Sequence, residues 1–360
     1  MRIKFSNNIQ TDFFSTLKSR VDGYFEENKI SKNANFVMIL KTIFFLGNFF
    51  LIYGLIISNT FSPVSMLGMC FLLGLFTAFI GFNVSHDAVH GSYSSNKTIN
   101  KILGYTFDFL GASSYLWSIM HNIIHHTFTN IPEHDDDLEP VFFIRLSKTK
   151  KLYKIHRYQH WYATLFYGLT SFSWVFLKDY KKMFTTQFGN YTVKKHPLKE
   201  LLIIFFSKAI YYFIFIILPI LVLSVSWWQV LLGFFVMHFA QGVTLAIVFQ
   251  LAHVVEDVEF PQPSAEGNIE NNWAIHQINT TSNFARKSFL ANWFFGGLNF
   301  QIEHHLFPTI CHVHYKRLSE IVKNTANEFN ITYNENRTML EAIFSHYKML
   351  KKLGREPQIV

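Results

Sequence analysis

Four long apolar segments constrain this chain more than any other feature of its sequence. Each carries at most one charged side chain, and they cover residues 36–58, 66–84, 201–223 and 230–251. About 20 consecutive apolar residues match the thickness of the hydrocarbon layer of a bilayer. The sequence therefore predicts four transmembrane helices in an all-α integral membrane protein.

The composition agrees with a protein embedded in lipid. The 360 residues are 50% hydrophobic and only 16% charged, whereas an ordinary soluble domain carries about 25% charged residues. The net charge of +8 is accompanied by no clustered basic helix or base-stacking module, so we predict no nucleic-acid partner. Cys70 and Cys311 are too few for a disulfide framework or a thiolate metal cluster. The N-terminus lacks the features of a cleaved signal peptide, so we expect the first apolar segment to be retained.

The distribution of basic residues predicts how the segments are oriented. Short linkers pair the segments into two expected hairpins, and these linkers carry no lysine or arginine. Residues 1–35, 85–200 and 252–360 carry 6, 14 and 10 such residues. By the positive-inside rule, both termini and the central loop face the cytoplasm. We expect Lys41 and Lys208, near the starts of their segments, to snorkel to the headgroups, and Trp227 and Trp228 to lie at the opposite interface.

Three histidine clusters lie close to the ends of these segments. They are HDAVH with His86 and His90, HNIIHH with His121, His125 and His126, and QIEHH with Gln301, His304 and His305. Positions four apart share a helix face, so the pairs His86–His90 and His121–His125 are each expected to serve one metal. His126 points elsewhere, toward a second metal. Seven imidazoles exceed the needs of one tetrahedral zinc ion, which indicates two metals.

Two weaker apolar stretches, Ile102–Met120 and Trp161–Leu177, complicate the topology. A single crossing by either one would place the membrane between histidine clusters. We therefore predict that both lie at the cytoplasmic interface, with a fifth span over Trp161–Leu177 as the alternative. The expected organisation is a cytoplasmic N-terminal segment (1–35), a membrane domain (36–312) with a cytoplasmic helical cap formed by 85–200 and 252–312, and a cytoplasmic helical tail (313–360).

Two features of the sequence bear on the identity of the metal: the imidazole donors, and the absence of the motifs of other metal sites. Imidazole suits zinc, copper, iron and nickel. The sequence contains neither the HExxH pattern of zinc proteases nor the Glu-x-x-His pairs of soluble di-iron bundles. A dinuclear histidine site beside an apolar membrane cavity favours iron and oxygen chemistry, because unactivated carbon–hydrogen bonds require a strong oxidant.

The three clusters, in this order around two hairpins, resemble the histidine boxes of membrane fatty-acid desaturases. The run WFFGGLNFQIEHHLFP, from Trp293 to Pro308, is similar to the front-end, linoleoyl-CoA desaturase-like branch. The resemblance covers about residues 36–320. It implies an oxidoreductase that uses two iron ions, dioxygen and two electrons to insert a cis double bond into a long, already unsaturated acyl chain.

The resemblance also implies roles for particular residues. The expected iron ligands are His86, His90, His121, His125, His126, His253, His304 and His305. Gln301 and His276 are further candidates, either as ligands or as their hydrogen-bond partners. Asp87, Asn122 and Glu303 lie inside the boxes and are expected to orient imidazoles. The di-iron centre itself is the catalytic group, with no separate acid or base.

Several other residues have two candidate roles, one functional and one purely structural. Trp117, Phe128 and Trp293 would line an acyl tunnel or simply pack in the core. The acidic run Glu133–Glu139 would contact the ligands or form a solvated loop. We expect His238, in mid-span, to form hydrogen bonds inside the bundle. The tail after Val313 is expected to form an amphipathic helix.

The expected partners are an acyl-CoA or acyl-lipid substrate, the surrounding membrane lipid and an electron donor. The sequence has no His-Pro-Gly-Gly haem loop, so we expect a separate ferredoxin or b-type cytochrome with its reductase. Lys148, Lys150 and Lys151 would dock that donor or the phosphates of coenzyme A, or would only mark a positive-inside loop. The absence of an organelle signal favours a bacterial cytoplasmic membrane, with the endoplasmic reticulum as the alternative.

Three other functions remain open at this point. A lipid hydroxylase, ketolase or conjugase would use the same boxes. A membrane haem cytochrome would need histidines that face each other inside the spans, whereas most lie at span ends. A metal transporter would need polar groups along the spans, and these are few beyond His238, Gln241 and Gln250.

Overall fold

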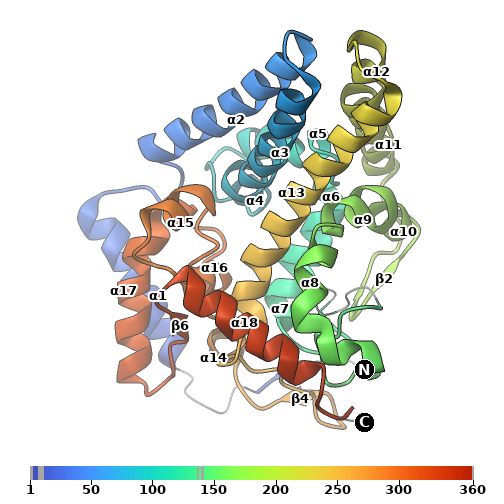
Figure 1. Cartoon of the computed structure of the whole chain (residues 1–360). Coiled ribbons are helices and arrows are strands. Elements are labelled where there is room, and N and C mark those ends of the chain that lie inside the picture. The colour runs from blue at the N-terminus through green and yellow to red at the C-terminus, as the bar shows by residue number, and fades with distance from the viewer. Residues whose placement is uncertain (1–2, 7–11, 136–137, 139–141, 359–360) are drawn as a thin grey trace.

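Four long apolar helical rods reach the top of the molecule in Figure 1, and the last of them continues through its centre into the lower half. The computed structural model describes residues 3–6, 12–135, 138 and 142–358. Within this part of the chain, four rods are long and apolar enough to cross a membrane. They are α2 (Phe36–Ile57); α3 (Pro63–Ile80) with η1 (Gly81–Ser85) and α4 (His86–Val89); α11 (Leu198–Tyr212) with η6 (Phe213–Ile217) and α12 (Leu218–Val222); and α13 (Trp227–His253). Each of the four predicted spans thus coincides with a helical rod long and apolar enough to cross a membrane. The second and fourth rods continue further than predicted, to Val89 and His253.

Glycines allow α13 to pack closely against two neighbours. A Cβ atom at Gly74 of α3 would lie 2.1 Å from the carbonyl oxygen of Met237. A Cβ atom at Gly242 would lie 2.7 Å from the carbonyl oxygen of Gly168. Small residues permit this backbone approach between membrane helices, so α13 is fixed between α3 and the segment around Gly168.

The segment Trp161–Leu177 does not form one continuous helix. It is divided among α8 (Gln159–Tyr167), α9 (Thr170–Ser173) and η5 (Trp174–Lys178), and α10 (Asp179–Met183) follows. A Cβ atom at Gly168 would lie 2.2 Å from the Phe239 ring, so the break between α8 and α9 sits where α13 crosses. The alternative of a fifth span here is therefore wrong for the described chain.

The stretch Ile102–Met120 is also interrupted. It contains most of α5 (Lys97–Phe109), α6 (Ser114–Trp117) and the start of η2 (Ser118–His125). The expected position of this stretch at an interface stays a prediction.

Lys41 and Lys208 are buried among protein partners, so the prediction that they snorkel to the headgroups is wrong. The Lys41 ammonium lies 2.8 Å from Nε2 of His312 and 3.2 Å from a backbone carbonyl. Lys208 donates to the Asp179 carboxylate at 2.7 Å and to two backbone carbonyls. An ammonium removed from water requires such partners. Each lysine therefore ties a span to neighbouring segments.

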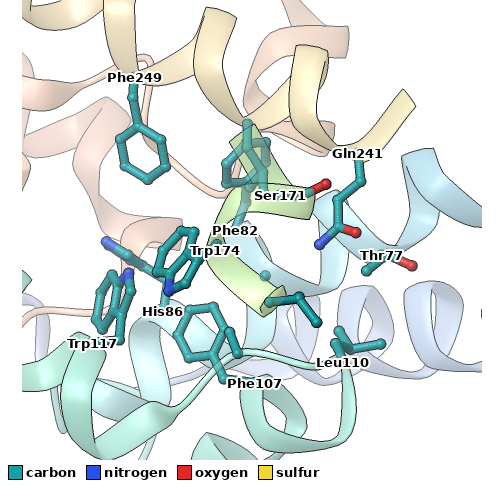
Figure 2. Close-up of a pocket in the computed structure, with 14 residues that line it drawn as sticks. Thr77, Phe82, His86, Phe107, Leu110, Trp117, Ser171, Trp174, Gln241 and Phe249 are labelled. Carbon is teal, nitrogen blue, oxygen red and sulfur yellow. The ribbon is translucent and has the colours of Figure 1, made fainter. Parts of the chain in front are cut away.

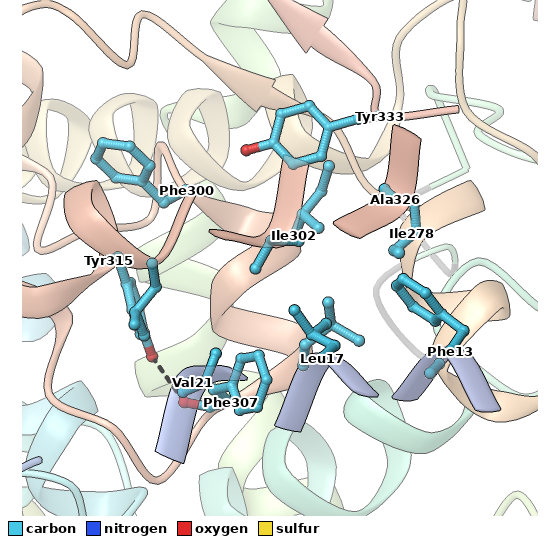
Figure 3. Packing of buried hydrophobic residues seen from close by; sticks show 14 of the residues in the cluster. Phe13, Leu17, Val21, Ile278, Phe300, Ile302, Phe307, Tyr315, Ala326 and Tyr333 are labelled. Atoms are coloured by element: carbon cyan, nitrogen blue, oxygen red, sulfur yellow. Dashed lines mark hydrogen bonds between the residues drawn. The ribbon is translucent and has the colours of Figure 1, made fainter. Parts of the chain in front are cut away.

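Helices from both ends of the chain pack together in the lower half. α1 (Asp12–Asn28) and α17 (Tyr315–Glu328) bury their apolar faces in one cluster that also contains Ile302. Figure 3 shows Leu17 and Val21 of α1 beside Ile302 and Phe307. The amphipathic helix expected after Val313 is present as α17, whereas α1 was not predicted. α18 (Met339–Leu353) packs on α8 and α13.

The remaining elements are short. The helical ones are α7 (His126–Phe128), η4 (Lys154–Tyr158), α14 (Trp273–Asn279), α15 (Phe289–Phe294), α16 (Gln301–Leu306) and η7 (His312–His314). Three pairs of two-residue strands are β1 (Lys4–Phe5) parallel to β4 (Asn268–Ile269), β2 (Gln187–Phe188) antiparallel to β3 (Tyr191–Thr192), and β5 (Asn283–Phe284) parallel to β6 (Glu335–Asn336). The fold is thus mostly helical, with minor strand pairing between distant loops.

The buried pair Lys208–Asp179 gives a test of this packing. Lys208→Met leaves the Asp179 carboxylate buried without its cation, so we expect the free energy of unfolding to fall by about 3 kcal/mol. Denaturant unfolding of the protein in detergent micelles measures this change. Lys32→Met removes the exposed pair with Asp22 and should change stability by less than about 0.5 kcal/mol. Equal losses of unfolding free energy in Lys208→Met and Lys32→Met would contradict the conclusion that Lys208 is the buried ionic partner of Asp179.

Candidate metal centre

Two adjacent groups of histidines lie where α4, η2, α13 and α16 meet. The first group is His86, His90, His121 and His304, and the second is His125, His253 and His305. In each group, one ring nitrogen from every residue lies within 4.8 Å of the others. Nitrogens bonded to a shared metal at about 2.0–2.1 Å lie up to about 4 Å apart. The limit of 4.8 Å is slightly wider than this, and each group could hold a metal ion.

His126 lies between the two groups. Its Nε2 atom is 3.2 Å from Nε2 of His121 in the first group. Its ring stacks on His305 of the second group, with 4.4 Å between centroids. The structure thus brings together the eight histidines that were expected as iron ligands, while the further candidate His276 belongs to neither group.

The HNIIHH cluster is wound differently from the expected α-helix. η2 is a π-helical segment, and such wider turns are frequent at functional sites. His121 and His125 stack at 5.1 Å, yet they belong to different groups. The expectation that these two residues serve one metal stays a prediction, since their rings share one face of η2 while their nitrogens fall in different groups.

Ring nitrogens in both groups lack hydrogen-bond partners. Within the described chain, no partner is found for either ring nitrogen of His86 or for Nε2 of His90, His253, His304 and His305. A buried polar atom without a partner is unfavourable, and native proteins keep few of them. These nitrogens fit a site that is completed by a bound cation.

The protonation state of the histidines agrees with this fit. Desolvation, followed by the proximity of other imidazoles, lowers the pKa of His121, His126, His304 and His305 well below the ordinary value. Desolvation likewise lowers the pKa of His90. Neutral imidazole is the form that binds metal ions, so the site presents ligands that need not lose a proton.

Oxygen atoms hold the outer nitrogens of several of these rings. Nδ1 of His125 lies 3.0 Å from the Asp135 carboxylate, and Nδ1 of His305 lies 2.9 Å from Oε1 of Gln277. Such contacts orient metal-binding imidazoles and raise their basicity.

Two of these partners were missed by the sequence reasoning. Gln277 and Tyr315, whose hydroxyl lies 3.3 Å from Nδ1 of His304, belong to no histidine box. Asp135 was considered only as part of the acidic run, of which Asp136, Asp137 and Glu139 lie outside the described residues. No local sequence signal connects Gln277 with His305, which lies 28 residues later, beyond β5 and α15.

The three polar residues inside the histidine boxes form their main hydrogen bonds with groups other than the expected metal ligands. Asp87 accepts a hydrogen bond at 2.9 Å from Nδ1 of His312, while Nδ1 of His86 is 3.8 Å away. Asn122 donates to the Val89 carbonyl. Glu303 accepts hydrogen bonds from Asn283 and Tyr333, and burial raises its pKa to about 7. A role of Asp87, Asn122 and Glu303 in orienting ligands stays a prediction.

Gln301 and His276 differ in their position relative to the two groups. Gln301 is buried on α16, and both atoms of its amide lack a hydrogen-bond partner among the described residues. The His276 ring packs on Phe5 at 5.1 Å and belongs to neither histidine group. Burial lowers the pKa of His276 to about 4. Nε2 of His276 also lacks a partner among the described residues, but of the two residues Gln301 alone lies on the QIEHH helix.

An apolar cavity adjoins His86. Phe82, Trp117 and Phe249 line it near His86, and Thr77, Leu110 and Gln241 line the other end (Figure 2). Trp117 also stacks on His121 at 4.2 Å, so it connects the cavity wall with the histidines.

The two other predicted tunnel residues do not line this cavity. Phe128 stacks on Phe5. Trp293 stacks on Phe289 and lies beside the Lys41 ammonium. Their aromatic rings serve packing here.

Comparison with known proteins identifies the family. The family model for fatty acid desaturases matches residues 62–337, which include every histidine described above. The chain belongs to the fatty acid desaturase family. This desaturase is 38% identical to the sn-1 linoleoyl-lipid 6-desaturase of Synechocystis sp., over 98% of both chains. It is 34% identical to the enzyme of the same name from Arthrospira platensis, over 96% of this chain and 94% of the relative. It is 37% identical to the acyl-lipid (8-3)-desaturase of Physcomitrium patens, over 95% of this chain and 72% of the relative.

Two glycines before the QIEHH box bring it against the first box in this desaturase. Gly296 has a φ of 57°, and a Cβ atom there would lie 2.1 Å from the Phe82 carbonyl oxygen. Gly297 has a φ of 74° and packs against His312. Glycine adopts positive φ without strain, so this pair lets the chain turn tightly against η1 and place α16 beside α4.

The contact between Gln277 and His305 predicts an effect on metal affinity. Gln277→Leu removes the oxygen that holds Nδ1 of His305, so we expect the affinity for ferrous iron to fall by about 10- to 100-fold. Equilibrium dialysis of the purified desaturase measures this affinity. Gln159→Leu is the matched control, because Gln159 is an equally buried amide bonded to backbone atoms of Arg145 and Leu350. Unchanged iron affinity in Gln277→Leu would show that this contact is dispensable.

Proposed function

We propose that this desaturase is a front-end acyl-lipid desaturase with two iron ions held by its histidines. The observation that carries the proposal is the convergence of two imidazole groups, with unpaired ring nitrogens, beside an apolar cavity. One iron would be held by His86, His90, His121 and His304, the other by His125, His253 and His305. His126 lies between them, and Gln301 would complete the set.

The chemistry of the site divides between the metal and the protein. When bound, the iron pair would supply the dioxygen-dependent redox chemistry that removes two hydrogens from adjacent methylenes. The protein would hold the acyl chain in the apolar cavity, with the reacting methylenes at the end nearest His86. Trp117, Phe82 and Phe249 would exclude water and orient the chain there, which favours reaction at one position.

The relatives support the choice of substrate. Proteins similar over most of this chain are named for linoleoyl-lipid and acyl-lipid substrates. An acyl chain attached to a membrane lipid reaches a cavity among membrane helices without leaving the bilayer. We therefore infer an acyl-lipid rather than an acyl-CoA substrate, with the new double bond on the carboxyl side of an existing one.

The proposed membrane arrangement is two hairpins, α2–α3 and α11/α12–α13, with the histidines on the cytoplasmic side. The linkers of the two pairs are joined by hydrogen bonds between Asn59 and Ser224. Few charges lie near these linkers, whereas the other segments carry the lysines and arginines. This distribution favours a cytoplasmic cap built from 85–200 and 252–312. Contacts of α1 with α17 support a cover over this cap that is built from the N-terminal segment and the tail.

Electrons would come from a separate carrier, either a ferredoxin or a b-type cytochrome with its reductase, at a bacterial cytoplasmic membrane. The lysines considered for docking are partly engaged within the chain. Lys148 pairs with Glu356 at 2.6 Å and Lys150 with Glu133 at 3.0 Å. These pairs favour a structural role for Lys148 and Lys150.

The proposal is tested by fatty-acid analysis of cells that express this chain and are fed linoleate. We expect a new trienoic product whose added cis bond lies on the carboxyl side, as determined by gas chromatography with mass spectrometry. His304→Ala should abolish the product and lower the iron content, because it removes a ligand of the first group and leaves the second group intact. His346→Gln is the control, since His346 is buried on α18 and bonded to Tyr167 and a backbone carbonyl.

Two results would decide against the proposal. Hydroxylated lipid in place of the trienoic product would assign the chain to lipid hydroxylation. Full activity and full iron content in His304→Ala would exclude the first group as a metal site.

A further inference from the structure

Two neighbouring helices, α8 and α18, present large apolar side chains at the surface of the described structure. On α8, Trp161 is 73% exposed and Leu165 is 61% exposed. On α18, Leu340 is 65% exposed and Phe344 is 63% exposed. Tyr347 of α18 joins the two helices, because its ring lies 5.5 Å from that of Trp161. We call these five residues the α8–α18 face.

The sequence of α18 makes this helix apolar on two sides. Leu340, Phe344 and Tyr347 follow each other at intervals of four and three residues, so they share the outer side of the helix. On the inner side, Ala342 and Leu350 belong to buried clusters with residues of α13 and α8, and Figure 1 shows α18 crossing α13. A surface helix ordinarily turns a polar side outward, so the outer side of α18 is suited to an apolar environment.

The depth of α8 along α13 indicates what that environment is. Gly168 caps the carboxyl end of α8, and its carbonyl oxygen meets Gly242 of α13. Gly242 lies about 22 Å along the helix axis from Trp227, where the span begins, at 1.5 Å per residue. This distance is less than the hydrocarbon thickness of about 30 Å, and any tilt of α13 shortens it further. The carboxyl end of α8 therefore lies at the depth of the lipid chains.

The helix α18 crosses α13 near the end of the same span. Nδ1 of His346 lies 2.7 Å from the carbonyl oxygen of Val254, directly after α13. Val254 is about 40 Å along the axis from Trp227, and a bilayer with its headgroup regions is about 40–45 Å thick. The middle of α18 thus lies at the level of the lipid headgroups.

Basic residues continue the α8–α18 face toward the carboxyl end of α18. Lys351 and Lys352 lie in the last turn of the helix, and Arg355 follows it. Desolvation, together with the charges of Arg355 and Lys351, lowers the pKa of His160, so both charges lie close to α8. An apolar stripe beside lysine and arginine is typical of a helix that lies in the membrane interface and attracts anionic lipids.

The acidic side chains near this face are engaged within the chain. Glu341 completes the capping box at the start of α18. Glu256 pairs with Lys348 at 3.1 Å. The basic end of the α8–α18 face therefore suits a negatively charged partner.

We propose that the α8–α18 face lies in the membrane interface, with lipid chains against its apolar residues and anionic headgroups at Lys351 and Arg355. The helix α18 then anchors the tail to the membrane surface and is not surrounded by water. An acidic electron carrier would suit the basic residues, but a soluble protein does not reach side chains at the depth of the lipid chains. The inference depends on the four membrane helices and not on the reaction that the protein catalyses.

Spin labels test this position of the two helices. Phe344→Cys and Leu165→Cys are labelled in the full-length protein, which is placed in nanodiscs with one copy per disc. We expect the label in Phe344→Cys to lie about 5–10 Å below the lipid phosphates, as in other interfacial helices, and the label in Leu165→Cys to lie deeper. Collision rates with dissolved oxygen and with a water-soluble nickel chelate measure this depth. The wild type gives the background from Cys70 and Cys311, which are half-buried and buried.

Asn324→Cys is the matched control, because Asn324 is exposed on α17. Its label should collide freely with the nickel chelate. The same free collision in Phe344→Cys and Leu165→Cys would place the α8–α18 face in water and overturn the inference. Exclusion of both oxygen and the nickel chelate at these two positions would show that protein covers the face, which would overturn it as well.

The basic end is tested by combining Lys351→Glu and Arg355→Glu in the labelled Phe344→Cys protein. In discs that contain anionic lipid, we expect the label to shift toward water, because the new carboxylates repel the headgroups. Discs of neutral lipid are the control, and the depth of the label there should stay the same. An unchanged depth in anionic discs would overturn the assignment of headgroups to Lys351 and Arg355.

Discussion

Removing many imidazole nitrogens from water is the constraint on which the rest of this structure depends. Each nitrogen needs a partner, either an oxygen of the protein or a bound cation. Asp135, Gln277 and Tyr315 satisfy outer nitrogens, and the inner ones face each other in two groups. The fold can maintain this arrangement only because the segments that carry the histidines are held in place from several sides.

The holding contacts come from distant parts of the chain. Lys41 of α2 contacts His312, which in turn bonds to Asp87 inside the first box. The glycine turn at Gly296 and Gly297 presses the third box against η1. α1 and α17 cover α16 from the other side. Apolar packing, close backbone approach and buried charge therefore all act on the same few histidine-bearing helices.

The sequence alone was sufficient for those features that depend on local composition. The four spans follow from apolar length, and the ligand candidates follow from histidine spacing and family resemblance. Lys41 and Lys208 were misplaced because hydropathy does not reveal a buried partner such as His312 or Asp179. Gln277 could not be assigned, because its contact with His305 exists only once α14 and α16 pack together. The helix α1 was not predicted, because its apolar face can be recognised as a buried surface only once α17 packs against it.

The π-helical winding of η2 has a consequence for how this region tolerates change in length. Such a turn accommodates one residue more than an α-helical turn does, so loss of one residue between His121 and His125 would be absorbed by a return to ordinary α-helical winding. The side chains beyond the deletion would then keep nearly the same directions around the helix axis. Loss of one residue from an ordinary α-helix such as α13 instead turns every side chain beyond it by about 100°. His253, at the end of α13, would then leave the second group although no histidine had been replaced. Among the helices that carry the histidines, η2 is therefore the segment in which a change of length disturbs the metal centre least.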